Sequence, residues 1–471
     1  MVEQYLIESG KRFRERLLGL LAASTALSTI FFWVLSSYFK VDVPASLMFI
    51  GQDSWCRVPA QSIGVHCFGD FNERFMPNIS DPVFPPFHNN LELSPIGPFL
   101  TSFFNFLARY ISQQIILIGL VLAFSVLLVF PMWTATKRFS LDERVLWIFL
   151  GAVGTYPFIA TIDRLNDIAL TVPLLFIFGT RFIQSEKNLP SQGYQHFWWI
   201  IPILVSIKPQ YILLSLIFVF VREFKQAIKS MILSVFLFCF LVVVAGKMDY
   251  HRLIEWFHLV FFYSKDFHNA QSSYPLNISI SRGLFIVVRL IQMTASAFSI
   301  NFRISLTTFN FALNIIQVIL FLLIAIMLVL YGRHVRKFHL LTVCLVLSSF
   351  LFGQFIAGYY TVVILAVLAL LVMNPSWARW SAEQDFKIKL GNVQRKQFTL
   401  IEINLMTAII LSCTTLAVPA PLTGSFVFFW NNNFVISPFL QQISSLVWLF
   451  YVLSVSVKSF RCARLQTKSE T

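Results

Sequence analysis

Long apolar runs separated by short basic clusters are the feature that most constrains the fold of this chain. A membrane-spanning helix needs about 20 consecutive apolar residues to cross a hydrocarbon core about 30 Å thick. Charged residues make up only 12% of the chain, too few to cover a water-exposed surface. The sequence therefore predicts an all-α polytopic membrane protein. The apolar runs cover residues 17–39, 97–133, 144–183, 197–221, 230–247, 308–331, 339–374, 398–417 and 438–457.

The positive charge of the chain follows the same pattern. The net charge is +14, but Lys and Arg recur in clusters between the apolar runs and do not form one stripe. Cytoplasmic loops of membrane proteins carry such an excess of Lys and Arg. We therefore expect lipid, not nucleic acid, as the surrounding partner. Lys11, Arg12, Arg14 and Arg16 precede the run 17–39, which reads as an uncleaved signal anchor with a cytoplasmic N-terminus.

Three of the runs do not fit a single crossing. As one helix, 339–374 would be about 54 Å long, and both of its ends carry basic clusters. The runs 144–183 and 197–221 are interrupted by polar residues or proline at 161–167 and 207–211. A break in each run, near 353–358 in the first, keeps every basic cluster in the cytoplasm. The prediction is about 12 crossings with broken or short helix pairs.

This topology forms one transmembrane domain, 1–471, with all three breaks on the outer side. Two long loops, 40–96 and 248–307, lie on that side too, and the tail 458–471 is cytoplasmic. The first loop contains a Pro-rich stretch that predicts a rigid segment with interfacial helices. It also contains Cys56 and Cys67, for which a disulfide and two free thiols are both open.

Ionisable and polar side chains gather at the breaks and in the outer loops. Such residues at membrane depth are costly, and broken helices are tolerated there only where they line a protein cavity. The sequence thus predicts one outward-facing polar cavity. Milder alternatives are a salt bridge that closes a turn, a snorkelling lysine and interface tyrosines. The residues are Asp53, His66 and Asp70; Asp163, Arg164, Asn166 and Asp167; Lys208, Gln210 and Tyr211; Asn277 and Arg282; Tyr359 and Tyr360.

The order of several short motifs resembles a known enzyme family. The motifs are Gly69-Asp70-Phe71, Phe84-Pro85-Pro86, Asp163-Arg164-Leu165-Asn166, Ile207-Lys208-Pro209, Leu276-Asn277-Ile278-Ser279 and Gly358-Tyr359-Tyr360. Together they resemble the polyprenol-phosphate-sugar-dependent glycosyltransferases of the GT-C superfold, in particular the family 87 type with its mannosyl- and arabinofuranosyltransferase-like members. Two positions depart from the family pattern. Leu165 stands where Gly is usual, and the last turn lacks the frequent His.

The resemblance implies transfer of a sugar from a polyprenyl-phosphate donor to a glycan or glycolipid acceptor at the extracytoplasmic face of a bacterial plasma membrane. It implies that Asp70, or alternatively Asp53, is the general base of an inverting reaction. Lys208, Arg164 and Arg282 would bind the donor phosphate. The remaining polar residues would line the substrate cavity. The chain contains no Asp-x-Asp pair, and we expect neither a metal nor another cofactor.

Two other classes of function stay open at this point. A multi-pass transporter or lipid-linked-sugar flippase would also use broken helices and intramembrane charges. Against it, the two halves of the chain show no internal repeat, and the breaks lie at one face of the membrane. A membrane scaffold whose outer loops bind a partner would perform no chemistry.

Overall fold

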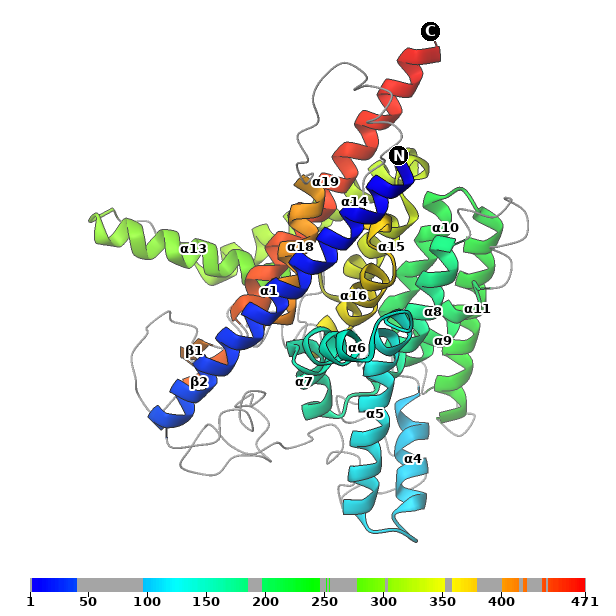
Figure 1. Ribbon diagram of the computed structural model, residues 1–471, viewed down its shortest axis with the longest axis vertical. Helices are drawn as coiled ribbons and strands as arrows, with labels where there is room; N and C mark the ends of the chain where they lie inside the picture. Colours follow the sequence, from blue (N-terminus) through cyan, green and yellow to red (C-terminus); the bar gives the residue numbers. More distant parts are fainter. Residues whose placement is uncertain are drawn as a thin grey trace.

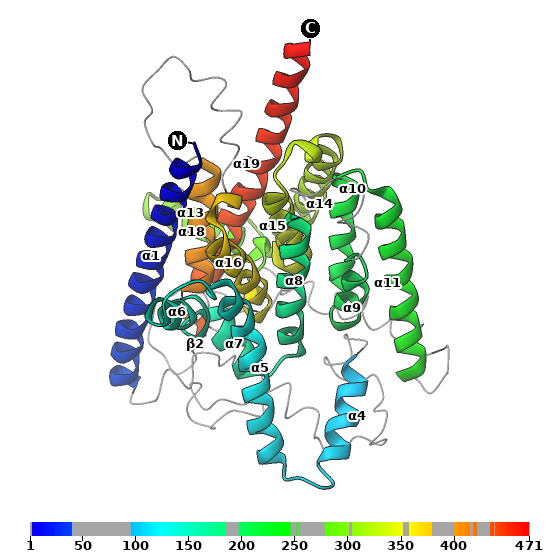
Figure 2. The same cartoon turned by 45° about the vertical axis from the view of Figure 1, so that its right-hand side comes forward.

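The computed structural model describes a nearly all-helical bundle (Figure 1). The first helix, α1 (Val2–Phe39), and the last, α19 (Phe439–Glu470), have their chain-terminal ends at the same end of the bundle (Figure 2). The described elements are helical except for a short antiparallel β-ribbon. It consists of β1 (Val418–Pro421) and β2 (Phe434–Ser437). The described residues are 2–39, 96–184, 197–245, 251, 254, 278–300, 304–351, 358–378, 400–414, 418–421, 434–437 and 439–470.

Long apolar helices confirm the predicted multi-pass character. Among the described residues, six helical segments are long and apolar enough to cross a membrane, and a bent pair makes a seventh. α14 (Leu306–Tyr331) is the most apolar of them. The six segments include α5 (Gln113–Ala135), α8 (Thr171–Gln184), α11 (Phe224–Ala245), α13 (Ile280–Ala297), α14 and α19.

Basic residues from distant parts of the sequence lie at one end of the bundle, which we call the basic end. Arg336 donates a hydrogen bond to the carbonyl of Ser376 at 2.8 Å, and Gly10 of α1 packs against Pro375 beside it. Aromatic rings lie beside other cations of these segments, and the electron-rich face of each ring attracts the positive charge. These pairs are Arg14 with Phe139, Lys337 with Phe182, and Lys229 with Trp198.

The run 144–183 folds into a first helical hairpin whose return arm ends at the basic end, where Phe182 contacts Lys337. Its outgoing arm bends by 63° between its two halves and stops at Arg164. Leu165 then adopts a left-handed conformation with φ of 49°, and the chain returns through α8. The outgoing arm consists of α6 (Leu141–Ile148), the π-helical η3 (Phe149–Val153) and α7 (Tyr156–Arg164), and the return begins with the 3-10 turn η4 (Asp167–Leu170).

A second hairpin consists of α9 (Ile200–Ile207) and a return arm of η5 (Pro209–Ser215) and α10 (Leu216–Phe220). Trp198, just before α9, lies over Lys229, and Ser215 at the end of η5 accepts a hydrogen bond from Ser230. Lys229 and Ser230 are neighbours on α11. The start of α9 and the end of η5 therefore lie beside the same part of α11. The reversal falls at Lys208, whose extended backbone precedes Pro209.

The third hairpin follows the same plan. α15 (Lys337–Val346) leaves the basic end and continues into the π-helical η7 (Leu347–Leu351). The chain returns through η8 (Gly358–Val362), α16 (Val363–Met373) and η9 (Pro375–Ala378) to the Arg336–Ser376 hydrogen bond. α16 is buried along nearly its whole length and packs on α5 and α8, so it forms the centre of the bundle.

Two segments differ from the sequence expectation. The run 97–133 is divided into α4 (Gly97–Leu107) and α5 by a turn that ends at Ser112, whose hydroxyl caps α5. The predicted loop 248–307 contains α13, which the sequence analysis missed because Arg282, Arg289 and Gln292 interrupt its apolar residues. α13 packs on α19 and extends sideways from the bundle (Figure 1).

Candidate functional site

The turns of the three hairpins meet inside the bundle. η4 contacts η8, η5 contacts η7, and η7 contacts η8. The three predicted breaks are therefore brought together, although more than 180 residues separate the first from the last. We call their polar residues the tip cluster, which consists of Asn166, Asp167, Thr171, Lys208, Tyr211, Ser349 and Tyr360.

A buried ion pair links the first two hairpins. The Lys208 ammonium lies 3.0 Å from a carboxylate oxygen of Asp167, and their side chains are only 11% and 3% exposed. The backbone presents both groups outside regular helix. Asn166 accepts a hydrogen bond from the amide of Ile168 and so caps the turn that carries Asp167. Lys208 lies in the extended link between α9 and η5.

Tyr211 extends the cluster toward the third hairpin. Its side chain is fully buried, and its hydroxyl lies 3.4 Å from that of Thr171. Thr171 donates its own proton to the carbonyl of Ile168, so it can only accept from Tyr211. Ser349 and Tyr360 are further polar neighbours of the Tyr211 hydroxyl. Residues from the turns of all three hairpins thus form a small polar core.

The tip cluster lies about one helix length from the basic end. The 14 residues of α8 rise about 21 Å from its start beside Asp167 to its end at the basic end. This rise is shorter than the hydrocarbon core of a membrane, which is about 30 Å thick. A charge at this depth needs a partner or a polar cavity. The Lys208–Asp167 pair meets that need and makes this region the strongest candidate site among the described residues.

Arg282 lies elsewhere in the structure. It is buried in the first turn of α13, with its guanidinium 5.3 Å from the ring centre of Phe285. This turn packs closely on α19, because Ser445 donates to the carbonyl of Ser279 and Gly283 approaches the carbonyl of Gln442. The contacts described for Arg282 are with this region and not with the tip cluster.

Several predicted site residues fall outside the described structure. Asp53, Cys56, His66, Cys67, Asp70 and Asn277 lie outside the described residues altogether. The backbones of Asp163, Arg164 and Tyr359 belong to α7 and η8, but their side chains lie outside the description. The predicted general base and the Cys56–Cys67 alternative therefore stay predictions. Gln210 is partly buried in η5 beside the cluster.

Sequence reasoning missed two members of the cluster, Thr171 and Ser349. Both lie in apolar helical runs, where a lone hydroxyl is ordinary. Their role follows only from the way the hairpins pack. No group of three or more His, Cys, Asp or Glu side chains suited to a metal ion occurs within the part of the chain that the structure describes.

Comparison with known proteins found no match for this chain among protein-family models, curated proteins or solved structures.

Proposed function

We propose that this chain is a membrane glycosyltransferase that moves a sugar from a polyprenyl-phosphate donor to a glycan or glycolipid acceptor at the extracytoplasmic face of a bacterial plasma membrane. The observation that carries the proposal is the buried Lys208–Asp167 pair where three hairpin turns meet. The motifs around Asp70, Lys208 and Tyr359 supply the resemblance to the GT-C superfold.

Lys208 suits an anionic leaving group. An ammonium carries a full positive charge and three N–H donors, and the Asp167 carboxylate lies 3.0 Å from it. Asp167 keeps the ammonium aimed at the meeting point of the turns, so we assign it as a positioning residue. Developing negative charge on the leaving phosphate is stabilised most where water is excluded, as at the depth of the tip cluster.

The chemistry needs one base and no metal-bound nucleophile. The carboxylate of Asp70, or alternatively of Asp53, accepts the proton of the acceptor hydroxyl. That oxygen forms a bond to the anomeric carbon as the bond from this carbon to the phosphate oxygen breaks. Polyprenyl phosphate leaves with the electron pair. A single displacement inverts the anomeric configuration. Arg164 and Arg282 remain further candidates for the phosphate.

The hairpins support the finer fold proposal of a GT-C-like bundle. Each hairpin has two apolar arms, some of them too short to count as full spans by length alone. Counting every arm as a short crossing, together with α1, α5, α11, α14, α19 and the apolar helix α18 (Leu400–Cys413), gives the arrangement of about 12 crossings expected from the sequence.

A transfer assay tests the proposal. Purified protein in nanodiscs receives a panel of polyprenyl-phosphate sugars and acceptor glycolipids, and the new glycosidic bond is detected by mass spectrometry. We expect Lys208→Met to lower transfer by about 100-fold or more, the usual effect of removing one preorganised charge donor. Lys229→Met, which removes a cation at the basic end, is the matched control and should retain activity. Asp70→Asn should abolish transfer while the protein still binds donor.

The alternative of a transporter or flippase draws on the same ion pair, because transporters also place paired charges beside broken helices at membrane depth. The two functions separate in sealed vesicles. A transporter would move a lipid-linked sugar across the membrane without forming a new bond. If Lys208→Met stops this movement and Asp70→Asn does not, the glycosyltransferase proposal is wrong.

A further inference from the structure

α13 has two contrasting faces. Arg282, Phe285, Arg289 and Gln292 follow a helical spacing of three and four residues, and Arg289 donates to Gln292 at 3.1 Å. The opposite face carries exposed apolar side chains, with Phe298 in the following turn 74% exposed. By length and composition this helix could cross a membrane. Its polar face and its connections argue for another placement.

The start of α13 lies far from the basic end. Tyr331, the last residue of α14, contacts Phe460 of α19 at the basic end, so the two helices run antiparallel from there. α14 has 26 residues and places its first turn about 39 Å away. Phe309 in that first turn packs edge-on against Phe285, with ring centres 5.8 Å apart. α13 therefore begins beside the far ends of α14 and α19.

The end of α13 cannot lie at the basic end. The amide of Ile300 donates to the carbonyl of Ala295, so the chain is still folded against the helix at residue 300. Five residues, 301–305, then lead to Leu306 at the far end of α14. Fully extended, this link spans about 21 Å. α13 has 18 residues, so a complete crossing would leave a gap of about 27 Å, which the link cannot close.

We propose that α13 is an interfacial helix that lies along the outer membrane surface, with its apolar face in the hydrocarbon of the outer leaflet. A helix with a basic polar face and an apolar opposite face has the composition for this position. The partner of the exposed face is the lipid bilayer, and Arg289 lies on the opposite face beside Phe285. α13 extends sideways from the bundle and does not run alongside α1 and α19 (Figure 1).

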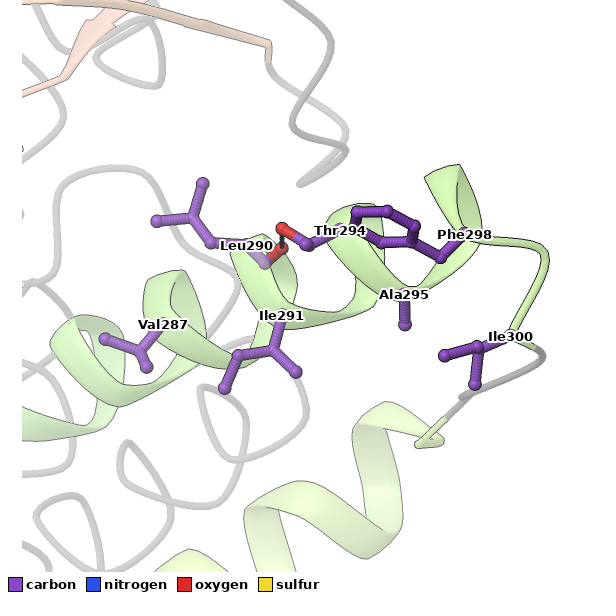
Figure 3. A pocket seen from close by; sticks show the side chains of 7 residues that line it. All are labelled: Val287, Leu290, Ile291, Thr294, Ala295, Phe298 and Ile300. Atoms are coloured by element: carbon purple, nitrogen blue, oxygen red, sulfur yellow. Dashed lines mark hydrogen bonds between the residues drawn. The ribbon is translucent and has the colours of Figure 1, made fainter.

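An apolar groove along α13 fits the same partner. Figure 3 shows its side chains in two rows along the helix, with Leu290, Thr294 and Phe298 in one row and Val287, Ile291 and Ala295 in the other. Thr294 is the polar member. The groove has a volume of about 450 Å³. In water such a surface would favour aggregation, whereas lipid chains cover it without cost. Its lining residues are Val287, Leu290, Ile291, Thr294, Ala295, Phe298 and Ile300.

Spin-label depth measurements on two pairs of neighbouring residues test the proposal. The pairs are Ile291 with Gln292 and Ala295 with Ser296, each residue changed singly to Cys in a full-length chain whose six native cysteines are Ala. The protein is placed in nanodiscs of phosphatidylethanolamine and phosphatidylglycerol. Labels at 291 and 295 should lie about 6–8 Å deeper than those at 292 and 296, because neighbouring side chains are about 100° apart around a helix about 10 Å wide.

Two outcomes would overturn the proposal. A steady change in depth of about 1.5 Å per residue, without regard to face, would show that α13 crosses the bilayer. Water accessibility at all four positions would show that it lies outside the membrane. Photo-cross-linking from p-benzoylphenylalanine at the same four positions, with all native cysteines retained, gives an independent measurement. We expect lipid adducts at 291 and 295 only, and equal adducts at all four positions would contradict the interfacial placement.

Discussion

Lys208 and Arg282 are both buried cations, but they are held in different ways. Lys208 reaches across from one hairpin to a carboxylate of another at 3.0 Å. One contact of Arg282 is with Phe285, one turn along the same helix. The first interaction joins two separate parts of the chain, whereas the second is local. Loss of Lys208 should therefore affect the contact between two hairpins, whereas loss of Arg282 should affect the first turn of α13.

The chemistry of the two side chains fits this difference. A lysine ammonium is a compact, strongly hydrated charge, so burial at membrane depth requires a close counter-charge. An arginine guanidinium is planar and more weakly hydrated, and it can stack on an aromatic face. The tip cluster thus depends on charge pairing, and the first turn of α13 depends on packing. The following experiments separate these two dependences.

The largest effect is expected for Asp167→Asn. This change leaves the Lys208 ammonium buried without its carboxylate, which costs about 3–5 kcal/mol in proteins where one partner of a buried pair is removed. The free energy of unfolding, measured by denaturant titration in detergent micelles, should fall by that amount. The double variant Asp167→Asn with Lys208→Met removes both charges and should recover most of the loss, without restoring sugar transfer.

The double variant provides the decisive comparison for the ion pair. If it is no more stable than Asp167→Asn alone, the carboxylate acts through contacts other than Lys208. In that case the three hairpins would be held together mainly by the packing of α16 and its neighbours.

A smaller effect is expected for Gly283→Ala at the root of α13. A methyl group there would lie 2.8 Å from the carbonyl oxygen of Gln442 and 2.9 Å from the Ser445 hydroxyl. Backbone cannot move aside easily, and such overpacking costs about 1–3 kcal/mol. Gly119→Ala is the matched control, because nothing lies within 4 Å of the added methyl in the middle of α5. Gly119→Ala should keep the free energy of unfolding or raise it by up to about 1 kcal/mol, because Ala favours helix over Gly. A loss at Gly119 as large as at Gly283 would contradict the close-packing explanation.

The sequence predicted the multi-pass helical class because its long hydrophobic runs and few charged residues suit a surface in contact with lipid. It also predicted where two hairpins reverse, because Lys208-Pro209 and the segment from Asp163 to Asp167 interrupt apolar runs. The convergence of those turns could be expected only from their shared side of the membrane. The Lys208–Asp167 distance itself depends on how α8, α9 and α15 pack, which no local pattern encodes.

Other features had weaker signals or none. Thr171 and Ser349 look like ordinary hydroxyls in apolar helices, and only tertiary packing gives them polar neighbours. α13 was missed because its polar face breaks the continuous hydrophobicity by which spans are recognised. Its i, i+3 and i+4 spacing of Arg282, Phe285 and Arg289 was a signal that could have revealed an amphipathic helix.

Phe285→Leu tests the packing side of the comparison. The ring lies 5.3 Å from the Arg282 guanidinium and 5.1 Å from that of Arg289, and it meets Phe309 edge-on. Losing these contacts should lower the free energy of unfolding by about 1–2 kcal/mol. Phe236→Leu is the control, since this exposed ring stacks only on Phe240 among the described rings. A loss at Phe285 no larger than at Phe236 would contradict the role of the ring in holding α13.

The smallest effect is expected for Tyr211→Phe, which removes one hydroxyl from the tip cluster and keeps the ring. Thr171 retains its hydrogen bond to the carbonyl of Ile168, so the Thr171 donor keeps its acceptor. The cost should be about 0.5–1.5 kcal/mol, the net value of one ordinary hydrogen bond. Denaturant titration of this variant beside Asp167→Asn then compares a hydroxyl with a charge at the same place. If the two losses are equal, hydroxyl contacts contribute as much as charge pairing, and the contrast between Lys208 and Arg282 no longer distinguishes the two regions.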